Sequence, residues 1–358
     1  MAITFFEDIT GARLNPGAVL DISKSETEKS KVLIISDFHM GAGRADDLAE
    51  NGLLLGTLLE EYYFRDGWYL LLNGDIEELQ RHSLEAIRKR WGDLYRIFDL
   101  FAAAGRLYKT LGNHDGDLLF EKDYPYMLYD AVRIETGLIP LYVYHGHQSS
   151  RVYAEYNNLV RAGIRYFLRP IGIRNVSSAR SPHRRFFVEK KAYNFSLENN
   201  CISVIGHTHR PLFESLGRFD FIKFEIERFC RDYPASGEEE KIRIAAEVKA
   251  LRLELGKLRR SERRDVLRQS LYGDDLPVPC LFNSGSAISK KGINAIELDR
   301  ENIALVYWFT EGKGMKFIRR GNYEVEKIPE RSARRAVLNR DRLDYIKARI
   351  ELLGASAN

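Results

Sequence analysis

Short apolar runs recur along the chain, and five of them are followed directly by a cluster of polar residues. The first run covers residues 32–36 (VLIIS) and is rich in branched side chains. Runs of this kind are typical of strands buried on both faces of a parallel sheet. The four later runs occupy residues 68–73, 106–111, 141–144 and 201–205. The pattern therefore predicts five buried strands, each ending in polar residues.

Two segments between the first three strands carry apolar residues at helical spacing. Residues 44–65 hold several leucines in this spacing, interrupted by Gly52 and Gly56. Residues 83–104 have a comparable apolar face, with Ser83 in position to cap the helix. Because strands and helices alternate, we predict an α/β fold with a doubly wound sheet.

The ends of the chain and its C-terminal third predict further elements. Residues 1–30 are polar and mixed and predict an N-terminal arm. Another strand is expected at 277–282, and antiparallel strands of a second sheet are expected at 293–298, 303–309 and 315–328. Apolar residues at 343, 346, 350 and 353 predict a C-terminal helix within 331–358. We therefore expect one domain over 31–330 with insertions at 151–191 and 220–276.

The insertion at 151–191 is strongly basic and contains interleaved aromatic residues. It holds ten Arg and Lys residues against two Glu, a net charge of +8, whereas the whole chain carries +4. Since it lies between the fourth and fifth polar clusters, it can form a cap that attracts phosphate groups. Arg184 and Arg185 are our candidate substrate contacts in it. The alternative is a solvated helical face, which is what charge runs usually are.

The insertion at 220–276 contains a charged helical segment with a narrow apolar seam. The seam residues are separated by alternating steps of four and three, which is typical of helix pairing: Ile244, Val248, Leu251, Leu255 and Leu258. Such a seam fits packing on the domain, and it also fits pairing with a second copy in a homodimer.

Composition narrows the class of protein. With 358 residues, 44% of them hydrophobic and 30% charged, the chain predicts a soluble globular protein. The three cysteines are far apart, which argues for a reducing, cytoplasmic location without a disulfide framework. We find no basic leader with an apolar run and no stretch of 18 apolar residues, so neither a signal peptide nor a transmembrane segment is expected. Peripheral membrane contact remains open.

The polar clusters after the five strands contain six of the eight histidines. The clusters are Asp37-x-His39, Gly74-Asp75, Gly112-Asn113-His114-Asp115, His145-Gly146-His147 and Gly206-His207-Thr208-His209. In open α/β sheets, ligands bind at the carboxyl ends of the strands. Imidazole, carboxylate and amide groups together suit divalent Mn, Fe or Zn. The number of donors is enough for two ions, and a carboxylate can bridge ions about 3.5–4 Å apart.

These five motifs, in this order, resemble those of the calcineurin-like metallophosphoesterase family. The resemblance implies a four-layer α/β/β/α sandwich of two mixed sheets and attack on a phosphoester by metal-bound hydroxide. It assigns the first metal to Asp37, His39 and His209, the bridge to Asp75, and the second metal to Asn113, His145 and His207. It implies that His114 contacts the phosphate or protonates the leaving group, with Asp115 orienting it. His147 is expected to reach only the substrate or the surroundings of the ligands.

The substrate class is less sharply defined by the motifs. The second motif reads GDIEE instead of the pattern typical of protein Ser/Thr phosphatases, which argues against a protein substrate. We expect a small phosphorylated metabolite or nucleotide. Glu77, Glu78 and the GHTHRP sequence also resemble the UDP-2,3-diacylglucosamine pyrophosphatase branch. His114 and His147 depart from that branch, which typically has Arg and Asp there. A nuclease and a non-catalytic binding scaffold are the further alternatives, but a net charge of +4 makes nucleic acid a weak candidate.

Overall fold

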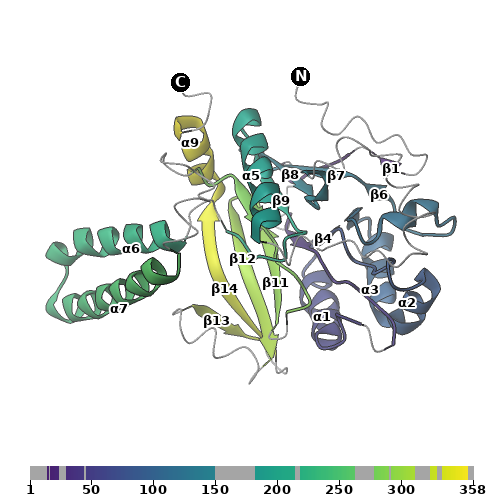
Figure 1. The fold of residues 1–358 in the computed structure, drawn as a ribbon, viewed down its shortest axis with the longest axis horizontal. Coiled ribbons are helices and arrows are strands. Elements are labelled where there is room, and N and C mark those ends of the chain that lie inside the picture. Colours follow the sequence, from purple (N-terminus) through teal and green to yellow (C-terminus); the bar gives the residue numbers. More distant parts are fainter. Residues whose placement is uncertain are drawn as a thin grey trace.

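The computed structural model describes residues 14–15, 17–23, 30–43, 46–149, 182–213, 218–262, 278–289, 292–310, 323–328 and 333–353. Two mixed sheets lie face to face, with helices on their outer sides (Figure 1). The larger sheet has the order β1-β6-β5-β4-β3-β11-β12-β14-β13, and the smaller has the order β10-β9-β8-β7-β2. The predicted α/β class and four-layer α/β/β/α sandwich are confirmed.

All five predicted core strands form, and they are divided between the two sheets. The first three are parallel neighbours in the larger sheet: β3 (Val32–Ile35), β4 (Tyr69–Asn73) and β5 (Leu107–Thr110). The last two are parallel neighbours in the smaller sheet, β8 (Pro140–Tyr144) and β9 (Ile202–Ile205). Strand β10 (Leu281–Asn283) pairs parallel with β9. Apolar residues of both sheets, such as Ile34, Leu71 and Val204, form a shared core between them.

The C-terminal strands extend the larger sheet and do not form the second sheet as predicted. Strand β11 (Ile293–Leu298) lies antiparallel to β3, followed by β12 (Asn302–Thr310), β14 (Ala333–Arg342) and β13 (Glu324–Lys327). Pairing with β11 covers the edge of β3 that β4 leaves free, and an uncovered edge strand invites aggregation. The smaller sheet is completed instead by β7 (Ala131–Glu135) and β2 (Ala18–Asp21).

Two terminal predictions are corrected. Within the predicted arm 1–30, β1 (Leu14–Asn15) pairs with β6 (Leu128–Tyr129), and β2 pairs with β7. In the C-terminal segment 331–358, the predicted helix forms as α9 (Leu343–Leu353), which contains all four of the apolar residues that predicted it, but the first ten described residues form the strand β14. Arg335 of β14 is buried against Glu297 of β11, so the strand hides a charged residue by pairing it. That pairing was not readable from the sequence.

The helices that cover the larger sheet differ in detail from the prediction. The first begins at Gly52, with α1 (Gly52–Thr57) continuing directly into the π-helix η1 (Leu58–Phe64). The second is two helices, α2 (Leu84–Arg90) and α3 (Gly92–Ala103), separated at Trp91. The side chain of Ser83 caps α2 by accepting a hydrogen bond from the amide of Ala86, as expected. Short 3-10 turns follow β5 and β8, η2 at Gly116–Phe120 and η3 at His147–Ser149.

Each predicted insertion contributes helix. From the basic insertion the structure describes the start of α5 (Pro182–Asn199), which packs on the smaller sheet through Val188, Ala192 and Tyr193. The other insertion forms a helical hairpin of α6 (Arg218–Asp232), η6 (Tyr233–Ala235) and α7 (Glu238–Glu262), which projects to the left in Figure 1. No described helix is long and apolar enough to cross a bilayer.

Candidate metal centre

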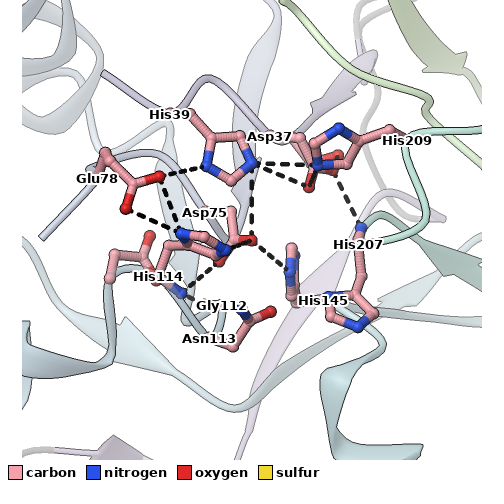
Figure 2. A network of polar contacts seen from close by, with 12 residues as sticks. Asp37, His39, Asp75, Glu78, Gly112, Asn113, His114, His145, His207 and His209 are labelled. Atoms are coloured by element: carbon pink, nitrogen blue, oxygen red, sulfur yellow. Dashed lines mark hydrogen bonds and ion pairs between the residues drawn. The ribbon is translucent and has the colours of Figure 1, made fainter. Parts of the chain in front are cut away.

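The polar clusters meet at one edge of the two sheets (Figure 2). Five of the seven predicted metal ligands have a backbone in the left-handed region: Asp37 (φ 57°), His39 (φ 45°), Asp75 (φ 53°), His207 (φ 62°) and His209 (φ 55°). Among the other described non-glycine residues only Asn200 shares this conformation. Such backbones are strained and concentrate at functional sites. The chain therefore bends sharply at the strand ends in order to aim these side chains inward.

The first group of donors comes from the ends of β3 and β9. His209 Nε2 lies 3.1 Å from Asp37 Oδ1 and 3.1 Å from His39 Nε2. His39 Nε2 lies 3.9 Å from the same Asp37 oxygen. These three atoms are close enough to bind one cation, and all three side chains were predicted to do so.

The second group combines the ends of β4, β8 and β9. Asp75 Oδ2 lies 3.2 Å from His145 Nε2, and His207 completes a set whose donor atoms lie within 4.8 Å of one another. The same Asp75 oxygen lies 3.8 Å from His39 Nε2 of the first group. Asp75 is therefore placed between the two groups, as a bridging carboxylate must be.

Asn113 Oδ1 is buried in the centre and has no hydrogen-bond partner. Asp37 Oδ1 and His145 Nε2 are also buried, and they face other candidate ligands, His209 Nε2 at 3.1 Å and Asp75 Oδ2 at 3.2 Å. Burying a polar atom without a hydrogen-bond partner costs free energy. Such an atom in a native fold therefore indicates a bound ion or another ligand. Since these atoms belong to the predicted ligand set, the residues fit bound divalent cations.

The far nitrogens of two histidines are fixed by acceptors. His39 Nδ1 lies 3.1 Å from Glu78 Oε2, and His145 Nδ1 lies 2.9 Å from the backbone carbonyl of Asn73. An ionised carboxylate and a carbonyl only accept hydrogen bonds, so each Nδ1 carries a hydrogen and donates it. This leaves each Nε2 facing the centre, the arrangement usual for metal-binding histidines.

The electrostatics of the centre hold Asp75 ionised and His207 neutral. Burial alone would raise the pKa of Asp75, but the nearby imidazoles of His145 and His114 hold it well below its usual value. Burial and the neighbouring His145 lower the pKa of His207 to about 3, so its imidazole is neutral at physiological pH. An ionised carboxylate and a neutral imidazole are the forms in which these groups bind metals.

His114 is held by a residue that the sequence analysis did not assign to it. Its Nδ1 lies 3.0 and 2.9 Å from the two carboxylate oxygens of Glu78, and its Nε2 lies 4.0 Å from Asp75 Oδ2. Burial alone would lower the pKa of His114, but Asp75 and Glu78 raise it to about 9. Glu78 thus orients both His114 and the predicted ligand His39.

Asp115 does not have the predicted orienting role. Its Oδ1 accepts a hydrogen bond from the amide of Gly112 at 2.6 Å, and its Oδ2 accepts one from the amide of Ile76 at 2.9 Å. These bonds tie the loop after β5 to the loop after β4. Both oxygens of the Asp115 carboxylate accept hydrogen bonds from backbone amides. Glu78, rather than Asp115, therefore contacts the His114 ring.

A buried ion pair below the centre was also missed. Lys109 Nζ lies 2.6 Å from Glu77 Oε2 and 3.5 Å from Asp115 Oδ2, and all three side chains are fully buried. The other oxygen of Glu77 accepts hydrogen bonds from the hydroxyls of Tyr95 (3.0 Å) and Tyr124 (2.8 Å). A lysine inside an apolar strand was the one available signal. Its partners become apparent only when the two loops are placed together.

Gly112→Ala is expected to disrupt the centre. A Cβ at this position would lie 2.1 Å from Asp75 Oδ1 and 2.4 Å from the Asp75 amide, so Asp75 would have to move. We expect weakened Mn²⁺ binding by calorimetry and at least a ~100-fold loss of phosphoesterase activity, because small displacements at a centre have effects of this size. Gly116→Ala, whose Cβ would meet nothing within 4 Å, is the control. Equal metal affinity in the two variants would contradict this geometry.

The remaining predicted residues lie partly outside the described region. His147 is buried beside the second donor group, with its ring 5.5 Å from that of His145 and 6.4 Å from that of His207. Arg184 and Arg185 belong to α5, but their side chains lie outside the described residues, as does all of 151–181. Further along α5, buried Glu189 accepts from Thr208 Oγ1 at 3.0 Å and pairs with Arg210 at 3.0 Å. Helix α5 therefore contacts the loop that carries His207 and His209.

The chain matches one family of known proteins and is similar in fold to several solved structures. The model of the family described as Calcineurin-like phosphoesterase matches residues 30–236. Among solved structures, the Escherichia coli phosphoesterase YfcE is 12% identical, with a TM-score of 0.32, over 76% of this chain and 91% of its own. A single mutant of Vps29 from Entamoeba histolytica is 12% identical, with a TM-score of 0.31, over 79% and 94%. Vps29 from Cryptosporidium parvum is 13% identical, with a TM-score of 0.32, over 79% and 93%. No curated protein matches the sequence.

Proposed function

The chain belongs to the calcineurin-like phosphoesterase family, and from this premise we propose that it is a dinuclear-metal hydrolase of phosphoric esters. Its substrate is a phosphomonoester or phosphodiester of a small metabolite or nucleotide. The observation that carries the proposal is the position of Asp75 Oδ2 between two groups of donors, 3.2 Å from His145 Nε2 and 3.8 Å from His39 Nε2. All seven ligand positions are occupied by residues able to bind a metal, which argues against a scaffold that has lost its ions.

Each part of the centre has a defined task in this proposal. Asp37, His39 and His209 would hold one cation, Asn113, His145 and His207 would hold the other, and Asp75 would serve both. Mn, Fe and Zn all suit this set of oxygen and nitrogen donors. When bound, two such ions supply Lewis acidity and lower the pKa of water, so that a nucleophile is available at neutral pH.

His114 supplies the proton in our proposal. Its Nδ1 donates to Glu78, and its Nε2 faces the centre on the side of Asp75. The carboxylate of Glu78 stabilises the protonated ring, which can give its Nε2 proton to the departing oxygen. Glu78 keeps the ring in the orientation that this transfer needs.

Glu78→Gln is expected to slow hydrolysis about 10- to 100-fold, since partners that orient metal-binding histidines typically contribute that much to affinity or activity. Glutamine keeps the size of the side chain but loses the charge that both His39 and His114 contact. The measurement is steady-state kinetics of Mn²⁺-loaded protein at saturating substrate. Glu85→Gln, an exposed position in the first turn of α2, is the control. An unchanged rate would show that Glu78 does not contribute to hydrolysis.

The substrate is tested by a panel of esters on metal-stripped protein reloaded with Mn²⁺. The panel comprises p-nitrophenyl phosphate, bis-p-nitrophenyl phosphate, a UDP-linked acylated sugar and a single-stranded oligonucleotide. We expect turnover of the two simple esters. Strong preference for the sugar nucleotide would favour the UDP-2,3-diacylglucosamine pyrophosphatase-like alternative. Oligonucleotide cleavage that falls steeply with salt would favour the nuclease, and no turnover of any ester would contradict the hydrolase.

The cysteines support a cytoplasmic location in our proposal. None of the three forms a disulfide within the described residues; Cys201 and Cys280 are buried and Cys230 is exposed. An exposed free thiol is usual in a reducing compartment and unusual in a secreted protein.

A further inference from the structure

Helix α7 has two apolar faces, and only one of them is used within the described chain. Ile244 is buried and Val248, Leu251 and Leu255 are partly buried. The helix is packed against α6 and η6, so this seam faces α6 within the hairpin. The predicted seam therefore serves packing inside the chain, and the alternative that it pairs two copies does not fit the hairpin.

The opposite side of α7 carries a second row of apolar residues. Ile242, Ala246, Ala250 and Leu253 follow one another at steps of four, four and three, which places them along one helical stripe. All four are exposed, and the exposed fraction reaches 72% for Ile242 and 62% for Leu253. A helix that needed only one packed face would carry polar residues here. The hairpin projects from the body of the molecule, so this stripe is accessible to a partner (Figure 1).

The charges along α7 indicate what the partner is. Residues 238–247 contain four acidic and two basic residues, whereas residues 249–260 contain five basic residues and one acidic residue. An identical helix laid alongside in the opposite direction would bring the acidic half of each copy to the basic half of the other. A parallel partner would place like charges together.

The apolar stripe has the symmetry that such a pair requires. Ala246 and Ala250 lie two residues on either side of position 248, while Ile242 lies six before it and Leu253 five after it. In an antiparallel pair centred near 248, Ile242 of each copy meets Leu253 of the other, and the small alanines at the centre let the helices approach closely. A two-fold interface uses the same surface on both subunits and needs this self-complementarity.

We propose that the exposed stripe of α7 is a homodimerisation surface, through which two copies of this chain pair their α7 helices antiparallel. The contact involves one helix face of each copy, so it resembles a small interface and predicts a dissociation constant in the micromolar range. The inference does not depend on the proposed catalytic function, because the hairpin lies outside the metal centre.

Sedimentation velocity of the full chain between about 1 and 100 µM tests the proposal, with a reversible monomer–dimer equilibrium as the expected result. Ala246→Asp and Leu253→Asp should each raise the dissociation constant at least ~10-fold. Ala245→Asp is the matched control, because it makes the same substitution at an adjacent exposed alanine about 100° around the helix. It should leave the dimer intact. Circular dichroism checks that the hairpin is folded in every variant.

Disulfide trapping tests the direction of pairing. Chains with Cys230→Ser and either Ala246→Cys or Ala250→Cys are mixed in equal amounts and oxidised. Cross-links between the two kinds of chain should exceed those within either kind by much more than the two-fold ratio that random pairing gives. A monomer at 100 µM would overturn the proposal. So would a dimer that Ala246→Asp and Ala245→Asp affect equally, since that dimer would use another surface or respond only to helix propensity.

Discussion

Asp75→Asn is expected to abolish phosphoester hydrolysis while the protein remains folded. The substitution keeps the shape of the side chain and the acceptor for the amide of His114, which donates to Asp75 Oδ1 at 2.7 Å. It removes the negative charge from the atom that lies between the two groups of metal donors. Stabilisation of transition-state charge by metals contributes several kcal/mol, so we expect the rate to fall at least ~1,000-fold.

The measurement combines activity with a direct count of bound metal. Mn²⁺ bound per chain should fall in Asp75→Asn, while the circular dichroism spectrum and cooperative thermal unfolding are retained. Asp344→Asn is the control, because this exposed carboxylate on α9 is paired only with groups near it in sequence, such as Arg342. Wild-type activity in Asp75→Asn would contradict the two-metal mechanism.

Lys109→Met is expected to be among the most destabilising single substitutions in the chain. It leaves the carboxylates of Glu77 and Asp115 buried without their ammonium partner, which lies 2.6 and 3.5 Å from them. Breaking a buried ion pair from one side typically costs about 3–5 kcal/mol of unfolding free energy. Urea denaturation followed by circular dichroism measures this quantity, provided that the unfolding is reversible.

Lys31→Met is a closely matched control for Lys109→Met. Lys31 Nζ lies 2.8 Å from Asp66 Oδ2, almost the same separation as in the buried pair, but its side chain is 31% exposed and that of Asp66 is 48% exposed. Exposed pairs contribute about 0–1 kcal/mol, so this variant should lose little stability. Comparable losses in the two variants would show that burial does not set the strength of the Lys109 pair.

A second substitution shows whether charge causes the destabilisation. In Lys109→Met combined with Glu77→Gln, the neutral amide oxygen can still accept the hydroxyls of Tyr95 and Tyr124. Asp115 keeps its bonds from the amides of Gly112 and Ile76. We therefore expect the double variant to recover part of the lost stability. No recovery would assign the loss to packing of the lysine side chain.

The donor residues of the centre were predictable because their signal is local. Asp37 and His39 directly follow an apolar strand, and the same pattern recurs at Asp75, so sequence position implies a common edge of one sheet. His145 follows β8 of the smaller sheet, whose position beside the larger sheet was implied only by the resemblance to the family. The structure brings all of these side chains together. The roles of the seven donor residues and of His114 came from the resemblance to the family, and those roles remain predictions.

The residues that support the donors were not predictable because their partners are distant in sequence. Glu78 contacts His39 and His114 only because the loops after β3, β4 and β5 converge. The assignment of Asp115 to His114 assumed that sequence neighbours pair, whereas Asp115 binds the backbone. Strand β14 was missed because Arg335 looks like a surface residue until its pairing with Glu297 is known.

The most direct test of the dinuclear phosphoesterase is to measure hydrolysis as a function of the number of metal ions bound per chain. Metal-stripped protein is titrated with Mn²⁺, bound metal per chain is measured by elemental analysis, and hydrolysis of bis-p-nitrophenyl phosphate and p-nitrophenyl phosphate is recorded at each point. We predict no hydrolysis without metal and full activity when two ions are bound. Two bound ions without hydrolysis, or hydrolysis by the stripped protein, would contradict a dinuclear phosphoesterase.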